Sequence, residues 1–135
     1  MRSRPFHPTV ALRATSDPFQ RWAAESKQVR HSLVASLRAA HEMIGCGPDA
    51  MLSTSDQLMA VSCHAQGWLS GHPCPKADLD GLLAQASRSF AALGARLEDE
   101  AKKPTEPHWP AIDREMTGLY RMLADVSTLM RHWST

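Results

Sequence analysis

The sequence predicts an all-α fold, an antiparallel up-down-up-down four-helix bundle with a flexible N-terminal arm. Clusters of glycine and proline interrupt the 135-residue chain at 45–48, 71–75 and 104–110. The long stretches between these clusters contain few helix breakers, and their apolar residues recur three and four positions apart. That period is typical of a helix with one buried side. Four such helices joined by short loops are expected to pack as antiparallel neighbours.

The first helix is predicted over 17–45. Asp17 offers a side-chain acceptor at the N-cap, and Pro18 suits the first helical turn. Gly45 and Gly47 are expected to end the helix. Its apolar stripe consists of Phe19, Trp22, Ser26, Val29, Leu33, Leu37, Ala40 and Ile44.

The second helix, predicted over 48–70, has apolar residues on two sides. Its main stripe consists of Met51, Leu58, Val61, Ala65, Trp68 and Leu69. A second, weaker strip of Leu52, Met59 and Cys63 is rotated away from the first. A helix that is apolar on two sides is either wedged deep in the bundle or covered by a partner. We therefore expect these three residues to form an interface, either in a homodimer or with another protein.

The third and fourth helices are predicted over 76–103 and 108–133. Gly81 and Gly94 lie inside the third helix, where each costs roughly 1 kcal/mol relative to alanine, and they favour close contact between helices. The third stripe consists of Leu79, Leu82, Leu83, Ala86, Phe90, Leu93, Leu97 and Ala101. The fourth consists of Ile112, Met116, Leu119, Leu123, Val126, Met130 and Trp133.

Residues 1–16 are predicted to form a flexible basic arm ahead of the bundle at 17–135. The arm contains Arg2, Arg4 and Arg13 and no acidic residue, whereas the rest of the chain has slightly more acidic than basic residues. Nucleic-acid-binding proteins usually gather their basic residues on one face, and this sequence has no such pattern. The composition therefore argues against a nucleic-acid partner.

The three cysteines favour reduced thiols and a cytoplasmic protein. Cys46 and Cys74 are expected at opposite ends of the second helix, roughly 30 Å apart at ~1.5 Å per residue, which is too far for a disulfide. No apolar run reaches the ~18 residues that a membrane span needs, and the N-terminus lacks the apolar segment of a secretory signal. The excess of arginine over lysine and the lack of asparagine are typical of a GC-rich bacterial genome.

No cofactor or metal is expected. None of the glutamates at 25, 42, 98 and 115 is followed three positions later by the histidine that ferritin-like bundles use, and no Cys-x-x-Cys-His motif is present. Cys63, His64, His72 and Cys74 have the composition of a zinc site, but their spacing fits no standard one. Cys74, near the start of the third helix, is expected to have a lowered pKa and to be the most reactive thiol.

The segment from Arg38 to Gly45 resembles the phospho-accepting helix of histidine phosphotransfer domains, which are also four-helix bundles. In that family an exposed histidine is followed by an apolar residue, lysine and glycine. Here Met43 and Gly45 match, but Ile44 replaces the lysine and the helix ends where the family's continues. The resemblance implies that His41 accepts a phosphoryl group, and the missing lysine puts this role in doubt.

Antiparallel order places three of the four tryptophans at the same end of the bundle. Trp22 begins the first helix, while Trp68 and Trp133 end the second and fourth, so all three are expected beside the loop at 71–76. His72 and Cys74 belong to that loop. The cluster is interpreted either as a hydrophobic plug or as a pocket for a small molecule or peptide.

The favoured hypothesis for function is a non-catalytic protein-protein interaction or regulatory module. It follows from the lack of a recognisable catalytic motif, from the second strip on the second helix and from the basic arm. Binding of a small molecule or peptide at the tryptophan-rich end is the first alternative. A phosphotransfer-like role for His41 is the second.

Overall fold

The computed structural model describes residues 17–134, which form five α-helices and, within this range, no strand. The helices are α2 (Pro18–Glu25), α3 (Lys27–Glu42), α4 (Pro48–Gly71), α5 (Ala77–Lys102) and α6 (Trp109–Ser134). The all-α class is confirmed, but the predicted count of four helices is wrong by one. The predicted arm at 1–16 lies outside the described residues.

The predicted first helix is interrupted at Ser26, which separates α2 from α3. The Ala23 carbonyl accepts hydrogen bonds from two side chains, Ser26 Oγ at 3.2 Å and Arg30 Nη2 at 2.8 Å. An uninterrupted helix would offer this carbonyl to the backbone N–H four residues later. Side chains that insert into the backbone ladder are a recognised cause of helix kinks. Ser26 also accepts from Arg30 Nε at 3.0 Å, so both residues stabilise the break.

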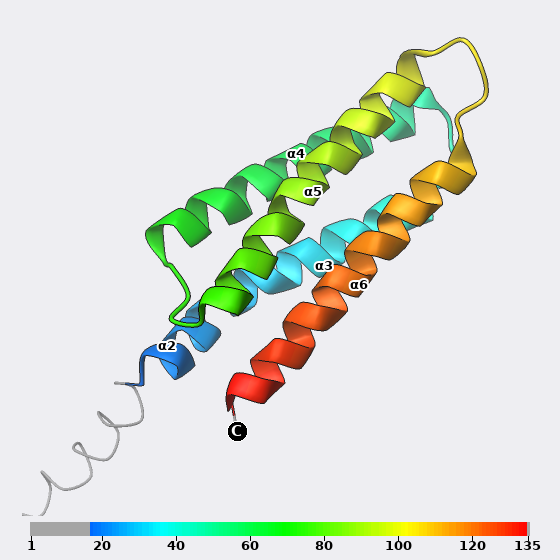
Figure 1. Cartoon of the computed structure of the whole chain (residues 1–135). Coiled ribbons are helices and arrows are strands. Elements are labelled where there is room, and N and C mark those ends of the chain that lie inside the picture. The colour runs from blue at the N-terminus through cyan, green and yellow to red at the C-terminus, as the bar shows by residue number, and fades with distance from the viewer. Residues whose placement is uncertain (1–16, 135) are drawn as a thin grey trace, which may run out of the picture.

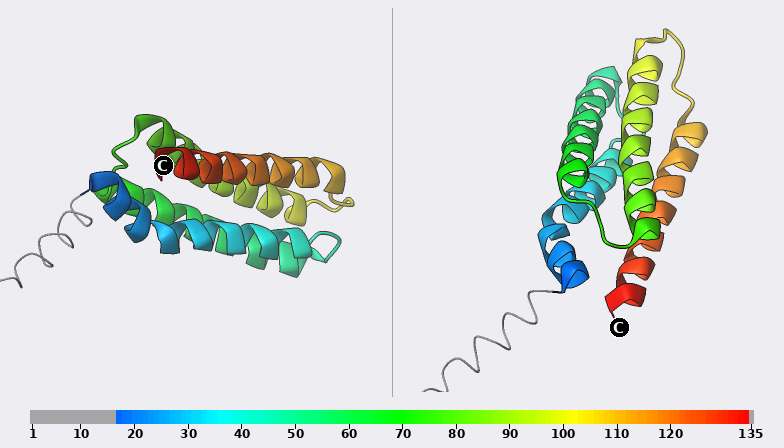
Figure 2. Two further views of the ribbon diagram at one scale, coloured as in Figure 1. Left: turned by 90° about the horizontal axis from the view of Figure 1, so that it is seen from below. Right: turned by 60° about the vertical axis from the view of Figure 1, so that its left-hand side comes forward.

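The four long helices lie side by side, and consecutive ones run in opposite directions (Figure 1). α3 contacts α4 and α6, and α5 contacts α4 and α6, which closes a ring of four neighbours around the core. The short helix α2 lies at the same end of the molecule as the α4–α5 loop and the end of α6 (Figure 2). The connections α3–α4 and α5–α6 lie at the opposite end.

The contact between α4 and α5 is the most extensive of the bundle, and it is lined by small and polar residues. Ser55 Oγ donates to the Gly94 carbonyl and Ser62 Oγ to the Ser87 carbonyl, each at 2.6 Å. A Cβ added at Gly94 would lie 3.1 Å from the Ser55 carbonyl oxygen and 3.2 Å from Met59 Cγ. Gly94 therefore allows the two backbones to approach closely, as expected, whereas the same expectation for Gly81 is wrong, because Gly81 is exposed and nothing lies within 4 Å of its Cβ position.

The core is formed by the predicted stripes with small shifts at the helix ends. Phe90, Leu33, Leu37, Leu83 and Leu97 are fully buried. Met43 is buried in place of Ile44, and Val61 and Trp68 are only half-buried, whereas Ser55 and Ser62 are buried in α4. Within 17–134 no helix has the length and apolar character needed to cross a membrane.

Candidate functional site

Of the three tryptophans expected at one end of the bundle, two form a cluster with His72. Trp22 and Trp68 have ring centroids 6.2 Å apart, and Trp68 stacks on the His72 ring at 4.3 Å with an interplanar angle of 7°. Trp22 Nε1 donates to the His72 carbonyl at 2.8 Å, which ties α2 to the end of α4. This part of the cluster is packed and hydrogen-bonded, as expected of a plug that closes the bundle.

Trp133 lies at the same end but contacts different groups. Lys76 Nζ is 4.3 Å from the centroid of the Trp133 ring, a cation–π contact between the α4–α5 loop and α6. Trp133 Nε1 is buried and has no hydrogen-bond partner, the one such side-chain atom found among the described residues. None of four cavities formed by described residues is lined by Trp22, Trp68 or Trp133, although one of them lies between the end of α4 and the start of α5.

Cys74 differs from the sequence-based expectation of a lowered pKa. The residue is buried at 8% exposure, and burial raises the pKa of its thiol. The hydrogen bond from the Lys76 N–H to Cys74 Sγ, at 3.5 Å, acts in the opposite direction but is the smaller effect. The expectation of a lowered pKa is wrong, because the chain between α4 and α5 folds the thiol inward instead of leaving it at an open helix end.

The three residues predicted as an interface lie on α4 outside the buried core, but Met59 borders α5, since its Cγ is 3.2 Å from the position that a Gly94 Cβ would occupy. Met59 is 39% exposed, and among the described residues it is the one large hydrophobic side chain classed as exposed. Cys63, one turn further along, is exposed, and Leu52 is half-buried at the start of the helix. Ala60, Gly67 and Ser70 are exposed on the same side, and so is Asp56, which lies four residues before Ala60 and seven before Cys63. Met59, Ala60, Cys63, Gly67 and Ser70 are referred to below as the α4 outer face.

The two cysteines and two histidines considered as zinc ligands do not lie close together in the structure. Cys63 and His64 are exposed on α4, His72 stacks on Trp68, and Cys74 is buried beyond the helix end. Within 17–134 no group of three or more His, Cys, Asp or Glu side chains lies close enough together to hold a metal ion.

His41 lies on the seam between α3 and α6. Its Nε2 is 3.4 Å from Asp113 Oδ1, and its ring meets Tyr120 edge-on with centroids 6.3 Å apart. The His41 side chain is 54% exposed. An adjacent carboxylate repels an incoming phosphoryl group, so this geometry does not favour a phospho-accepting role.

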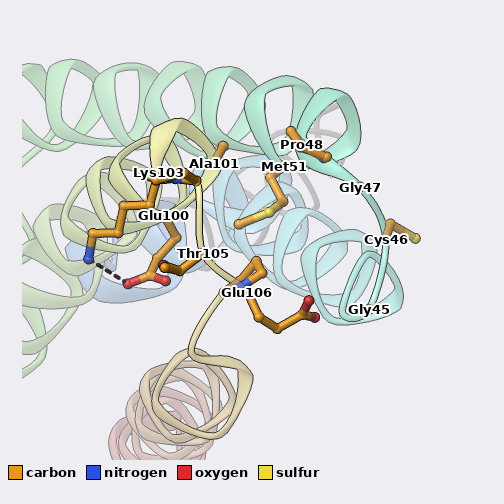
Figure 3. A pocket seen from close by; sticks show the side chains of 12 residues that line it. Gly45, Cys46, Gly47, Pro48, Met51, Glu100, Ala101, Lys103, Thr105 and Glu106 are labelled. Atoms are coloured by element: carbon orange, nitrogen blue, oxygen red, sulfur yellow. Dashed lines mark hydrogen bonds and ion pairs between the residues drawn. The ribbon is translucent and has the colours of Figure 1, made fainter.

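A cavity of about 380 Å³ lies at the end of the bundle opposite Trp22, Trp68 and Trp133 (Figure 3). Its walls are the α3–α4 connection, from Gly45 to Pro48, and the end of α5 with the following loop, up to Pro107. Met51 and Glu100, both buried, also line it. The Glu100 carboxylate is already paired with protein groups and is not available to a ligand.

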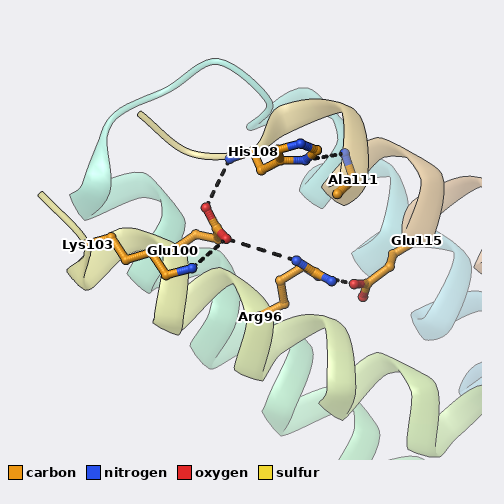
Figure 4. A network of polar contacts seen from close by, with 6 residues as sticks. All are labelled: Arg96, Glu100, Lys103, His108, Ala111 and Glu115. Atoms are coloured by element: carbon orange, nitrogen blue, oxygen red, sulfur yellow. Dashed lines mark hydrogen bonds and ion pairs between the residues drawn. The ribbon is translucent and has the colours of Figure 1, made fainter. Parts of the chain in front are cut away.

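Glu100 is the centre of a polar network that fixes the α5–α6 loop (Figure 4). Its Oε1 accepts from the His108 N–H at 3.0 Å and its Oε2 from Lys103 Nζ at 3.2 Å. Arg96 Nη1 is 4.0 Å from Glu100 Oε2, and Arg96 Nε donates to Glu115 Oε1. The hydrogen bond from His108 and then that from Lys103 lower the pKa of the Glu100 carboxyl below its ordinary value.

Replacing Glu100 by glutamine is expected to destabilise the fold at neutral pH, because the amide cannot pair with Lys103 and Arg96. A folded-state pKa below the unfolded one stabilises the protein above the unfolded pKa, and this stabilisation is lost as the pH falls through the folded pKa. The melting temperatures of wild type and Glu100→Gln should therefore differ at pH 7 and converge in strong acid.

Melting curves recorded from neutral to strongly acidic pH test this expectation, with Glu98→Gln as control. Glu98 makes an exposed pair with Lys102 at 3.1 Å, a type of contact that contributes little to stability. If the melting temperatures of wild type and Glu100→Gln differed by the same amount at every pH, the ionised Glu100 carboxylate would not be the source of the stabilisation.

Comparison of the chain with protein-family models, with curated protein sequences and with solved structures found no match. The sequence-based reasoning missed Ala60, Gly67 and Ser70 of the α4 outer face. The signal for them was present, because no Asp, Glu, Lys or Arg occurs between Asp56 and Lys76.

Proposed function

We propose that this protein is a non-catalytic interaction module that binds a protein partner through the α4 outer face. The observation that carries the proposal is the scarcity of charge there, since Asp56, one turn before Ala60, is followed by a long uncharged stretch. From Gln57 to Gly71 the exposed side of α4 has no charged residue. The exposed sides of α5 and α6 carry charged residues, for example Arg88, Asp99, Arg121 and Asp125.

A helix side that faces water in a globular protein usually carries charged residues. The α4 outer face instead presents Met59, small residues and a thiol. Such composition is typical of the centre of an interface, where charged residues are depleted and methionine is enriched. The face loses little solvation energy when a partner covers it, because it contains few strongly hydrated groups.

The helical scaffold supports this role in our proposal. We treat α2 and α3 as one helix kinked at Ser26, so that the architecture is an up-down-up-down four-helix bundle. The close α4–α5 contact includes Met59, whereas Ala60, Cys63, Gly67 and Ser70 of the α4 outer face remain exposed. We further propose a cytoplasmic setting, which the free thiols of Cys46, Cys63 and Cys74 favour.

A benzophenone side chain introduced at Ala60, on the α4 outer face, tests the proposal in the cells that naturally express the protein. We expect irradiation to give one discrete crosslinked product. The same side chain at Asp125, which is exposed on α6, is the control and should give none. No product from position 60, or equal products from both positions, would overturn the proposal.

A second candidate function, binding of a small molecule or peptide at the tryptophan-rich end, is favoured by one observation. Trp133 Nε1 is a buried donor without an acceptor, and such groups usually have one. A ligand or an ordered water that accepts from this N–H would remove the penalty. The substitution Trp133→Phe tests this point.

A further inference from the structure

We propose that α2 is an exchangeable helix, which leaves its own bundle when the kink at Ser26 straightens and docks on a second copy of this chain. Its docking site is the bundle end where α2 lies in the structure, beside the α4–α5 loop and the end of α6 (Figure 2). Two copies related by a twofold axis exchange their α2 helices reciprocally, which is a recognised route to dimers. This interaction uses a different surface from the α4 outer face and goes beyond the proposed function.

The chain around Ser26 is suited to a straight helix. No glycine or proline occurs from Phe19 to Ile44, and the apolar spacing continues through Ser26. The Ser26 backbone is itself right-handed helical, with φ −81° and ψ −6°. That ψ differs by only about 35° from the usual α-helical value. The Ser26 N–H still donates to the Trp22 carbonyl at 2.8 Å, so a small rotation joins α2 and α3 into one helix.

The kink is held by side-chain hydrogen bonds that a straight helix does not contain. Ser26 Oγ and Arg30 Nη2 both donate to the Ala23 carbonyl. When α2 and α3 are continuous, the Lys27 N–H donates to this carbonyl, as the α-helical pattern requires. Straightening therefore replaces side-chain donors by a backbone donor at one carbonyl, and the kinked and straight forms differ by few interactions.

α2 is held on the bundle by two buried side chains, Phe19 and Trp22. A helix of eight residues is too short to be stable alone, so α2 needs either this docking or continuation into α3. α3 is held in the core independently of α2, because it buries four side chains of its own, those of Val29, Leu33, Leu37 and Ala40. α2 can therefore leave while α3 stays in place.

The site that α2 vacates is complementary to α2 itself. Trp22 Nε1 donates to the His72 carbonyl at 2.8 Å, and the Trp22 ring centroid lies 6.2 Å from that of Trp68. Departure of α2 leaves this carbonyl without its donor and exposes apolar surface, and both changes are unfavourable. The α2 helix of a second copy restores these contacts, because its sequence is the same. The expected occupant of the site is therefore α2 from another copy of this chain.

Protein concentration decides between the monomer and the exchanged dimer. In the monomer, α2 and its site belong to one chain, so docking is intramolecular and is favoured in dilute solution. In the exchanged dimer the same contacts form between chains, and α2 and α3 are one continuous helix. The dimer is therefore expected to increase as the concentration rises.

Removal of the side-chain bonds at the kink tests the hinge. These bonds exist only in the kinked form, so Ser26→Ala/Arg30→Ala in the full chain should lower the dissociation constant of the dimer at least ~10-fold in sedimentation equilibrium. Ser36→Ala/Arg38→Ala makes the same two replacements further along α3 and should leave the dissociation constant at its wild-type value. A hinge variant that stays monomeric, or dimerises no more tightly than this control, contradicts the inference.

Isotope-filtered NOE spectroscopy of the hinge variant shows which surfaces meet in the dimer. Labelled and unlabelled chains are unfolded together in equal amounts and refolded. Exchange of α2 should give cross-peaks between the Trp22 ring of one copy and the Trp68 ring of the other, whereas in a monomer both rings belong to the same chain and give no filtered signal. A dimer without these cross-peaks, such as one formed through the α4 outer face, would show that α2 is not exchanged.

Discussion

Replacing Gly94 by leucine is expected to lower the free energy of unfolding by about 3 kcal/mol, near the upper end of typical overpacking effects. The first side-chain atom alone would lie 3.1 Å from the Ser55 carbonyl oxygen, which is backbone and cannot rotate away. A leucine would therefore force α4 and α5 apart. That movement would also strain the bonds from Ser55 to Gly94 and from Ser62 to Ser87. Urea denaturation monitored by circular dichroism measures the loss.

Gly81→Ala is the matched control on the same helix. Gly81 is exposed, and nothing lies within 4 Å of its added Cβ. The change should raise the free energy of unfolding by about 0.5–1 kcal/mol, because alanine is the better helix former. If Gly94→Leu also raised the free energy of unfolding, helix propensity rather than helix contact would govern both sites.

The contrast between these two glycines shows what the sequence can predict. Both lie within a helix that has a clear apolar stripe, and the sequence pattern alone does not show which of them faces the backbone of another helix. The same limit applies to α4, where Ser55 and Ser62 are buried in the contact with α5. Serine is polar, so a pattern of apolar residues misses these positions, although a hydroxyl can donate to a carbonyl of the neighbouring helix.

The break at Ser26 was missed for a related reason. Ser26 fits the apolar stripe of the first helix in its spacing, and it is fully buried. What interrupts the helix is the pair of side-chain bonds from Ser26 and Arg30 to the Ala23 carbonyl. Whether a side chain replaces the backbone N–H at this carbonyl depends on the side-chain conformation. The spacing of apolar residues carries no information about that conformation.

The tryptophan-rich end was located correctly from chain order alone, whereas the contacts there required coordinates. Chain order places helix ends together but does not specify hydrogen bonds. Trp22 is hydrogen-bonded and Trp133 is not, although both are aromatic residues at helix ends. This difference leads to opposite expectations for the same substitution.

Trp22→Ala should lower the free energy of unfolding by about 3–5 kcal/mol, the usual cost of truncating a buried tryptophan. Trp22 is 3% exposed and stacks with Phe19 at a centroid distance of 6.2 Å. Its indole N–H donates to the His72 carbonyl at 2.8 Å, so truncation also leaves that acceptor unpaired. The end of α2 should detach, which hydrogen exchange of residues 18–25 would detect.

Trp22→Phe and Trp133→Phe remove the same atoms from two different environments. Trp22→Phe breaks a hydrogen bond and should cost about 1–2 kcal/mol, whereas Trp133→Phe removes a buried donor that has no partner and should be nearly neutral or stabilising. Denaturant titration of both variants measures the difference. A loss for Trp133→Phe equal to that for Trp22→Phe would show that the Trp133 N–H has an acceptor in solution. That acceptor would be a ligand or an ordered water, and a compound that co-purifies with wild type but not with Trp133→Phe would identify a binding site.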